Sequence, residues 1–397
     1  MNVLSTFSGM GGLDEGLGAA GFDIVGAVDG SKFVIPNYKR NFPETPIYHG
    51  DVRHLLEHDW MDREGSFEIG EIGVLAGGPP CQGVSQIGPR DLDDKRNDLF
   101  EVFVKVAAKY KPKLVLMENV PNIHKLSDGH YHEELTRGFQ ENGYSNITRI
   151  NLHADDYGVP QNRERAFYFG IRDDLTLDYE LSQMVRVLAD RQKVDRTVGV
   201  WDAISDLPAD VVESDQTMPY PSCDEPTDYQ REMRRDYSGD IYSVDEKFER
   251  SIRNSDPELL HNHHTKGITD KRLERIEYLG PGDNADKIPD HLWNGVRPGK
   301  YRRLPLNEPS HTLLAQMHRD LSEWVHPKED RWITVREAMR LQSFHDGFIL
   351  GVSEFRMLQQ IGDSVPPLLG KAVGEIAISV IQNAEGEKVM DEMSAGA

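Results

Sequence analysis

The chain has 397 residues, two cysteines and a formal net charge of −22, from 67 acidic and 45 basic residues. This length is sufficient for two domains. No apolar run approaches the length of a membrane span, which needs about 18 residues. Two cysteines without zinc-site spacing exclude a disulfide framework, so we expect a protein of the reducing cytoplasm. The acidic excess predicts repulsion from other polyanions, which argues at first against a nucleic-acid partner.

The first 175 residues alternate between strand-like and helix-like segments. The expected strands are 2–7, 24–28, 72–76, 113–117 and 166–171, and the expected helices are 13–20, 98–110 and 131–142. Such alternation predicts an α/β fold, in which helices cover a mostly parallel sheet.

This alternation is lost between residues 176 and 300. An acidic, proline-containing stretch at 205–228 predicts a loop, and basic residues then return in clusters. Helical patterns resume at 334–344 and within 360–382, and the acidic end of the chain from 385 predicts disorder. The pattern indicates a second, irregular unit inserted into the α/β fold.

A glycine-rich turn follows the first strand, in "VLSTFSGMGGLDEGL". Gly9 and Gly11 allow a ligand to approach the backbone closely, and Asp29 ends the next strand at the distance expected of a ribose-binding acid. Asp51 follows a third strand-like segment. Together they predict a nucleotide-like cofactor, whereas the turn alone could be a tight strand-to-helix connection. The spacing differs from the G-x-G-x-x-G of NAD enzymes.

A thiol lies where the 72–76 strand must end, in "GGPPCQGVS". Cys81 is therefore expected at the ligand-binding edge of the sheet. Glu118 in "MENVPN" and Arg163 and Arg165 in "PQNRERAF" also lie at strand ends. Individually each could be an ordinary exposed residue, but together they provide a nucleophile, an acid and two cations.

The blocks "FSGMGG", "GGPPCQGVS", "MENV", "QNRERAF", "RRLPLNEPSHTLL", "TVREAMRLQSF" and "QIGDSVPPLLGKAV" occur in this order. In them the chain resembles DNA (cytosine-5) methyltransferases that use S-adenosylmethionine. The resemblance implies a Rossmann-like class I methyltransferase fold with a smaller, irregular target-recognition domain. It places the catalytic domain at 1–176 plus 352–397, and the recognition domain and hinge at 177–351.

The resemblance also implies the reaction, which methylates C5 of a flipped-out cytosine in a specific double-stranded DNA sequence. Cys81 would attack C6 of the base while Glu118 bonds N3 and the exocyclic amine. Arg165 would steady the cytosine carbonyl, and Arg163 would hold the site together. Taking the base out of the stack costs a few kcal/mol.

By the same resemblance, S-adenosylmethionine contacts Phe7, Gly9, Gly11, Asp29, Asp51, Pro79, Leu99, Ser364 and Val365. We expect DNA contacts from Gln82, Ser85, Arg234, Arg235, Arg272 and Arg303, and no metal. The loop 83–97 is expected to close over the flipped base.

The chain departs from the family pattern at Val84, where Phe is usual, at Asp363, where Asn is usual, and at His345, where Pro is usual. None of the three changes the chemistry, although Asp363 adds a negative charge near a cationic cofactor.

Two alternatives remain open at this point, namely cytosine-5 methylation of a structured RNA such as tRNA and a catalytically silent DNA-binding protein. We expect a monomer that acts in the cytoplasm, with a restriction endonuclease as a candidate partner. The net charge of −22 predicts a salt-adapted protein, because a Debye length of roughly 3 Å at 1 M salt hides distant carboxylates from DNA.

Overall fold

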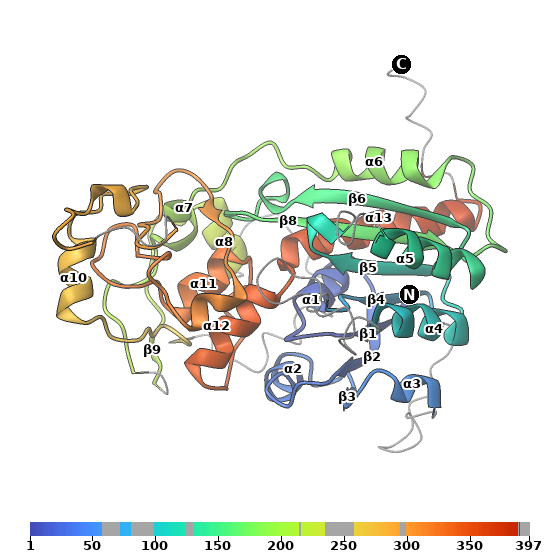
Figure 1. Cartoon of the computed structure of the whole chain (residues 1–397), viewed down its shortest axis with the longest axis horizontal. Coiled ribbons are helices and arrows are strands. Elements are labelled where there is room, and N and C mark those ends of the chain that lie inside the picture. Colours follow the sequence, from blue (N-terminus) through green and yellow to red (C-terminus); the bar gives the residue numbers. More distant parts are fainter. Residues whose placement is uncertain are drawn as a thin grey trace.

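The computed structural model describes residues 1–57, 72–80, 99–123, 130–213, 216–234, 258–293, 299–387 and 389. The predicted site residues Cys81, Gln82, Ser85 and Arg235 and the predicted loop 83–97 lie outside these ranges. The described residues form a sheet with helices on both faces, beside a smaller part with little regular structure (Figure 1).

The sheet has seven strands in the order β3-β2-β1-β4-β5-β8-β6 within the described residues. All neighbouring pairs are parallel except those of β8, which is antiparallel to β5 and to β6. These strands are β1 (Asn2–Thr6), β2 (Asp23–Asp29), β3 (Ile47–His49), β4 (Val74–Gly77), β5 (Leu114–Asn119), β6 (Asn146–His153) and β8 (Glu164–Ile171). The expected mostly parallel α/β sheet is confirmed.

The helices around the sheet are α1 (Gly12–Ala19), α2 (Ile35–Asn41), α3 (His54–Glu57), α4 (Leu99–Tyr110), α5 (His130–Glu141), η3 (Ala154–Tyr157), α6 (Leu181–Arg191) and α13 (Pro367–Ala384). Glycines at positive φ follow the ends of α1 and α5, as the sequence indicated: Gly21 has φ 98° and Gly143 has φ 92°. The sequence analysis missed several elements of this side, among them the edge strand β6 and the helices α2, α3 and α6.

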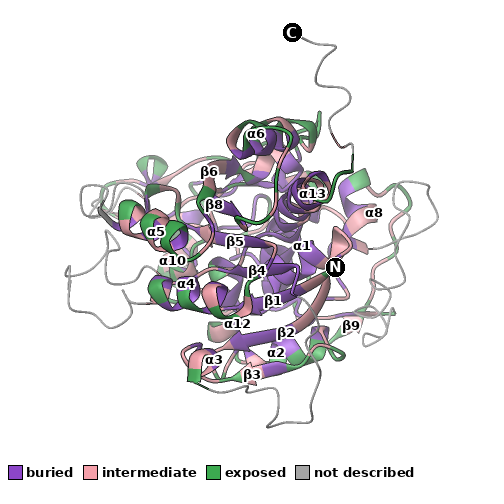
Figure 2. Ribbon diagram, turned by 90° about the vertical axis from the view of Figure 1, so that its right-hand side faces the viewer, coloured by how far each residue is buried: buried purple, intermediate pink, exposed green. Residues whose placement is uncertain are grey.

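Alternate residues of the central strands point to opposite faces of the sheet. In β5, Leu114 and Leu116 pack on the side of α1, α6 and α13, whereas Val115 and Met117 pack on the side of α4 and α5. Figure 2 shows the buried strands between these two layers of helices. Strands that are buried on both faces need apolar residues at every position, which is why they read as continuous apolar runs.

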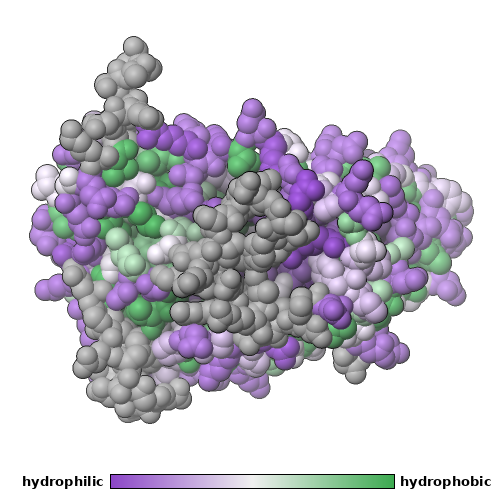
Figure 3. All heavy atoms as spheres, turned by 180° about the vertical axis from the view of Figure 1, so that it is seen from behind, coloured by the Kyte–Doolittle hydropathy of each residue, from purple (hydrophilic) through white to green (hydrophobic). Residues whose placement is uncertain are grey.

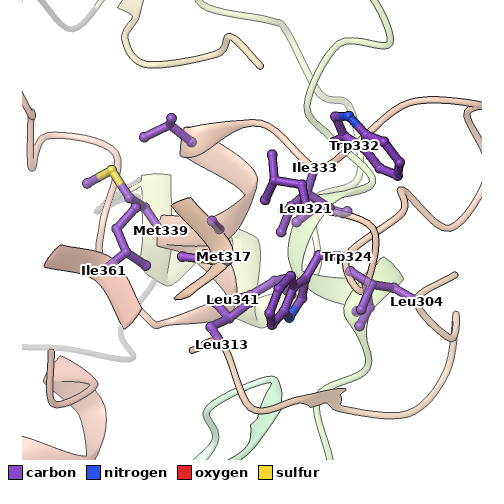
Figure 4. Packing of buried hydrophobic residues seen from close by; sticks show 14 of the residues in the cluster. Leu304, Leu313, Met317, Leu321, Trp324, Trp332, Ile333, Met339, Leu341 and Ile361 are labelled. Atoms are coloured by element: carbon purple, nitrogen blue, oxygen red, sulfur yellow. The ribbon is translucent and has the colours of Figure 1, made fainter. Parts of the chain in front are cut away.

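The smaller part has a core formed by residues between Val198 and Ile361, together with Met10 from the glycine turn. Its elements are α7 (Val200–Ile204), β9 (Met218–Pro219), α8 (Asp228–Arg234), β10 (Leu259–Leu260), α10 (Asp270–Ile276), η4 (Ala285–Lys287), β11 (Ser310–His311), η5 (Ala315–His318), α11 (Val335–Leu341) and α12 (Glu354–Asp363). Figure 4 shows Trp324 and Trp332 among aliphatic side chains from α11, α12 and η5. A two-residue pair between β7 (Gln161–Asn162) and β11 joins this part to the sheet side.

One stretch of the described chain is long and apolar enough to cross a membrane, by length and composition alone. It spans 354–384 and combines α12 with α13. Within its apolar window, 67% is buried inside the structure, where α13 packs against α1 and the sheet. The burial identifies it as part of the core.

A buried ion cluster stabilises the smaller part. Arg340 of α11 is fully buried and contacts Asp346 at 2.5 Å and Asp206 at 3.2 Å. Arg340 lowers the pKa of the Asp346 carboxyl to about 2, against the effect of burial. Because all these groups are removed from water, each charge depends on its partners.

We predict that Arg340→Met lowers the free energy of unfolding by about 3–5 kcal/mol, since Asp346 and Asp206 would lose a buried cation. The control is Arg231→Met, which breaks an exposed pair with Asp228 and should cost at most about 1 kcal/mol. Urea denaturation measures both. Equal losses for the two variants would contradict a special role for the buried cluster.

Candidate active site and cofactor cavity

The strand ends meet at one edge of the sheet. The carboxyl ends of β1, β2, β4 and β5 lie together because these strands are parallel. Strand β8 runs the other way, so its first residues reach the same edge. Its register pairs Asn119 with Ala166, which places Arg165 beside the end of β5. The antiparallel strand therefore delivers arginines to the site that the parallel strands form.

Glu118 and Arg165 form an ion pair at this edge. The Arg165 Nε lies 3.0 Å from the Glu118 Oε1, and each side chain is 15% exposed. Burial raises the pKa of Glu118, although Arg165 and Arg163 oppose the shift. At Gly78 a Cβ would lie 2.8 Å from the Glu118 Oε2, so glycine leaves room for the carboxylate. A carboxyl in this setting can hold a proton and bond a heterocyclic nitrogen.

Arg163 is fully buried and binds backbone rather than a carboxylate. Its guanidinium donates to the carbonyls of Leu313 at 2.9 Å, Gly362 at 2.9 Å and Ser364 at 2.8 Å. Burial lowers the pKa of Arg163, and the nearby Arg165 lowers it further. The side chain therefore fixes two distant loops against the sheet edge.

Asn119 positions the exit of β4. Its side-chain amide donates to the carbonyl of Pro79 at 2.9 Å, and its oxygen accepts from the N–H of Val120 at 2.8 Å. Pro79 and Pro80 line the same cavity as Glu118. The strand exit that precedes Cys81 is thus tied to the strand that carries Glu118.

The glycine turn is held by Asp29. The Asp29 carboxylate accepts from the N–H of Gly9 at 2.9 Å and from the N–H of Ser31 at 2.7 Å. Gly9 has φ 56°, and a Cβ added there would meet nothing within 4 Å. The turn therefore faces open space at the end of β2. Burial raises the pKa of Asp29.

A cavity of about 1000 Å³ extends from the glycine turn to the Glu118–Arg165 pair. Eight of the nine residues predicted to contact the cofactor line it: Phe7, Gly9, Asp29, Asp51, Pro79, Leu99, Ser364 and Val365. Gly11 is the exception, because it caps α1 at φ 99° and packs against the Phe42 ring. The lining combines two carboxylates for hydroxyl donors with apolar walls, and both the size and the chemistry fit an adenosine-containing cofactor.

The sequence analysis missed several cavity residues. Asp14 accepts hydrogen bonds from Ser5 and Tyr38, each at 2.7 Å, and burial raises its pKa to about 6. Gln316 of η5 and Leu314, which precedes this helix, also line the cavity. Asp14 was missed because it occupied an ordinary helical position in the sequence pattern. Leu314 and Gln316 were missed because only the fold brings the η5 segment to the edge of the sheet.

Two of the departures from the family pattern now have a structural setting. His345 Nε2 lies 3.0 Å from the Glu15 Oε1 in a buried contact between α1 and the segment after α11. Asp363 is exposed to the cavity, and the surrounding protein raises its pKa to about 6 by desolvation, against the attraction of Arg163 and Arg165. Val84 lies outside the described residues.

The predicted DNA contacts fit the structure less well. Arg303 is 3% exposed, and its guanidinium bonds carbonyls of Leu279, Ile276 and His326. Its assignment as a DNA contact is therefore wrong in this structure, because the group is buried in the core of the smaller part.

Arg234 and Arg272 also have protein partners. Arg234 lies 2.5 Å from Asp206 and stacks on Tyr220, with 11% of its side chain exposed. Arg272 is 36% exposed and lies 3.6 Å from Asp320. Arg272 keeps a surface that DNA could contact, whereas Arg234 is largely enclosed.

A family model for C-5 cytosine-specific DNA methylases matches residues 1–379. The chain belongs to this family. It is a DNA cytosine-5 methyltransferase, and members of the family generally depend on S-adenosylmethionine. The family match favours DNA over the RNA alternative.

The methyltransferase is 32% identical over 452 residues to the type II methyltransferase M.AgeI of Thalassovita gelatinovora, covering 96% of this chain and all of that protein. It is 33% identical over 383 residues to M.XorII of Xanthomonas oryzae pv. oryzae, covering 94% and 83% of the two chains. In structure it is similar to an E. coli protein assigned as a DNA modification methyltransferase encoded within a prophage. That similarity has a TM-score of 0.77 at 26% identity and covers 96% of this chain and 99% of the other.

We predict that Asp363→Asn stabilises the free enzyme at pH 8 and not at pH 3. The raised pKa of about 6 means that the charged carboxylate disfavours the folded state above pH 6, while below its ordinary pKa it is protonated in both states. The gain should be about 1 kcal/mol, since exposure to the cavity screens the charge. Thermal melts across this range measure it, and a difference that does not change with pH would contradict the assignment.

Proposed function

We propose that this methyltransferase binds S-adenosylmethionine in the cavity beside Asp29 and Asp51 and uses Cys81 as its nucleophile. The observation that carries the proposal is the shared cavity, which the glycine turn and the Glu118–Arg165 pair both line. A cofactor at one end and a base at the other would then be held within reach of each other.

The residues of the chain supply what cytosine chemistry needs. C5 of cytosine is a poor nucleophile until a thiolate adds to C6, and the covalent mechanism is general for the family. Glu118, with its raised pKa, can hold a proton toward N3 and accept a hydrogen bond from the exocyclic amine. Arg165 keeps that carboxyl oriented through their 3.0 Å contact. The cofactor, when bound, supplies the methyl group.

Recognition is assigned to the smaller part, whose core runs from Val198 to Ile361. The proposed recognition unit is 177–351. Helix α6 lies near its start and packs with the core of the sheet. The irregular segments of this part offer polar and basic groups to DNA, as base and phosphate contacts require.

The relatives named above are type II methyltransferases, which supports a role in a restriction-modification system. We propose a cytoplasmic monomer whose modification protects sites from a cognate restriction endonuclease. Bisulfite sequencing of a host genome that expresses the chain tests the activity, the base and the sequence together. A genome without new 5-methylcytosine would contradict the proposed function.

We predict that Cys81→Ser abolishes methyl transfer while S-adenosylmethionine binding is retained. A serine hydroxyl is far less ionised than a thiol at neutral pH, so the covalent step fails. Transfer of a labelled methyl group measures the first effect and calorimetry the second.

The matched control is Cys223→Ser. Cys223 is a free cysteine in the acidic stretch 205–228, and its replacement should leave methyl transfer intact. Residual activity of Cys81→Ser within about tenfold of wild type would refute a covalent role for this thiol.

We further propose that the acidic surface is an adaptation to salt. Hydrophilic side chains predominate on the face shown in Figure 3, with hydrophobic residues in small groups. At a net charge of −22, self-repulsion and repulsion from DNA are both reduced when the Debye length shortens.

The expected result is that structure and activity both increase with potassium chloride from tens of millimolar toward 1 M. Circular dichroism and methyl incorporation across the series measure the two effects. Full structure together with maximal activity at tens of millimolar salt would show that the acidic surface has another origin.

A further inference from the structure

A group of cations and aromatic rings lies at the edge of the cavity, outside the predicted site. We call it the rim patch. Its members come from the segment after β2, from the segment before α10, from the end of η5 and from the start of α12: Lys32, Phe33, Lys266, His318, Arg319, Phe355 and Arg356.

Aromatic rings hold the cations of the rim patch in place. The Arg356 guanidinium lies 4.1 Å from the centre of the Phe33 ring and 5.3 Å from that of Phe355. The Lys32 ammonium lies 5.2 Å from the Phe33 ring. His318 packs edge-on against Phe355 at 4.1 Å. Phe355 is nonetheless 46% exposed, so the patch reaches the surface.

The cations are poorly balanced by acids. Arg319 bonds the His318 ring at 3.2 Å, and Arg356 bonds Gln359 at 2.7 Å. Within the described ranges, neither arginine nor Lys32 has a carboxylate within ion-pair distance. The pKa of His318 is lowered by burial and further by Arg319, Arg356 and Lys266, which shows how closely these charges gather.

Two carboxylates face this group. Glu354 accepts from the N–H of Lys266 at 3.2 Å, and Asp320 pairs with Lys300 at 2.8 Å and with Arg272 at 3.6 Å. Asp320 is therefore already shared between two other cations. The rim patch keeps an excess of positive charge in a chain whose net charge is −22.

The rim patch continues the wall of the cavity. Phe33, Gln316 and Arg356 line the cavity itself. From Gln316 the η5 segment continues through His318 to Arg319, which is exposed. A nucleotide that enters the cavity would bring the phosphates of its own strand toward this edge.

We propose that the rim patch binds the phosphate backbone of the substrate DNA next to the flipped cytosine. Guanidinium groups that aromatic rings hold in one orientation lose little freedom when they bind a phosphate. A phosphate ligand would also relieve the repulsion among the cations. Such contacts fix the register of the duplex and do not read its sequence. The inference rests on the proposed function, because it requires a DNA substrate.

The test compares Arg319→Gln and Arg356→Gln with wild type in fluorescence anisotropy titrations at several salt concentrations. Two 30-base-pair duplexes are used, one with and one without the sequence found by bisulfite sequencing. Each variant should bind both duplexes about fivefold more weakly. Each should also lower the slope of log affinity against log salt by about 0.9 for every phosphate that the variant no longer neutralises.

The matched control is Arg186→Gln on α6, an exposed arginine with no ion pair in the described structure. It makes the same charge change and should leave the salt slope unchanged. Circular dichroism melts establish that the variants are folded. Arg319 does not line the cavity, so its variant also separates DNA binding from cofactor binding.

Failure of wild type to methylate any duplex would refute the proposed function and, with it, the inference that depends on a DNA substrate. If wild type methylates DNA and both variants keep its salt slope, the inference alone is overturned. The same holds if the variants lose only S-adenosylmethionine affinity, or if they weaken binding of a structured RNA and not of the duplexes.

Discussion

The guanidinium of Arg163 is the interaction on which the site depends. It is fully buried, and it donates to carbonyls at 313, 362 and 364, three positions that are 150 or more residues away in the sequence. A buried cation is costly unless it is hydrogen-bonded, and the two terminal nitrogens of Arg163 satisfy this need through the three carbonyls, although its Nε has no partner within the described residues. The side chain therefore holds both loops in one arrangement. Gln161 adds a second tie, because its oxygen accepts from the N–H of Leu313 at 2.9 Å. The cavity wall formed by η5 and the end of α12 follows from these contacts.

The direction of β8 explains why such an arginine is available at this place. In a fully parallel sheet, the start of the last strand would lie at the edge away from the ligand. Because β8 is antiparallel to β5, Arg163 and Arg165 arrive at the carboxyl edge, where Glu118 ends its strand. The reversed direction of β8 therefore brings Arg165 to Glu118 and brings Arg163 to the opposite wall of the cavity.

The sequence predicted the helices that carry apolar side chains on every turn, such as α4, and the strands that are apolar on both faces, such as β5. It missed β6, where most side chains are only partly buried and no apolar alternation appears. Helix α6 carried a usable signal in Leu181, Met184, Val185 and Leu188, all buried on one face. It was overlooked because the region around it was interpreted as irregular. The predicted strand-end residues do line the cavity, since parallel strands bring their carboxyl ends together.

Basic clusters could not be assigned in the same way, because a cluster in the sequence does not distinguish exposed cations from buried ones. Arg303, Arg336 and Arg340 are all buried in the smaller part, where they bond carbonyls and carboxylates of their own chain. Those charges maintain an irregular core that has few long strands or helices to satisfy its backbone. Within the described residues, these three arginines are therefore not available to a polyanion. Whether an acidic protein can hold DNA then depends on where its unpaired cations gather, since only nearby charges are felt through salt.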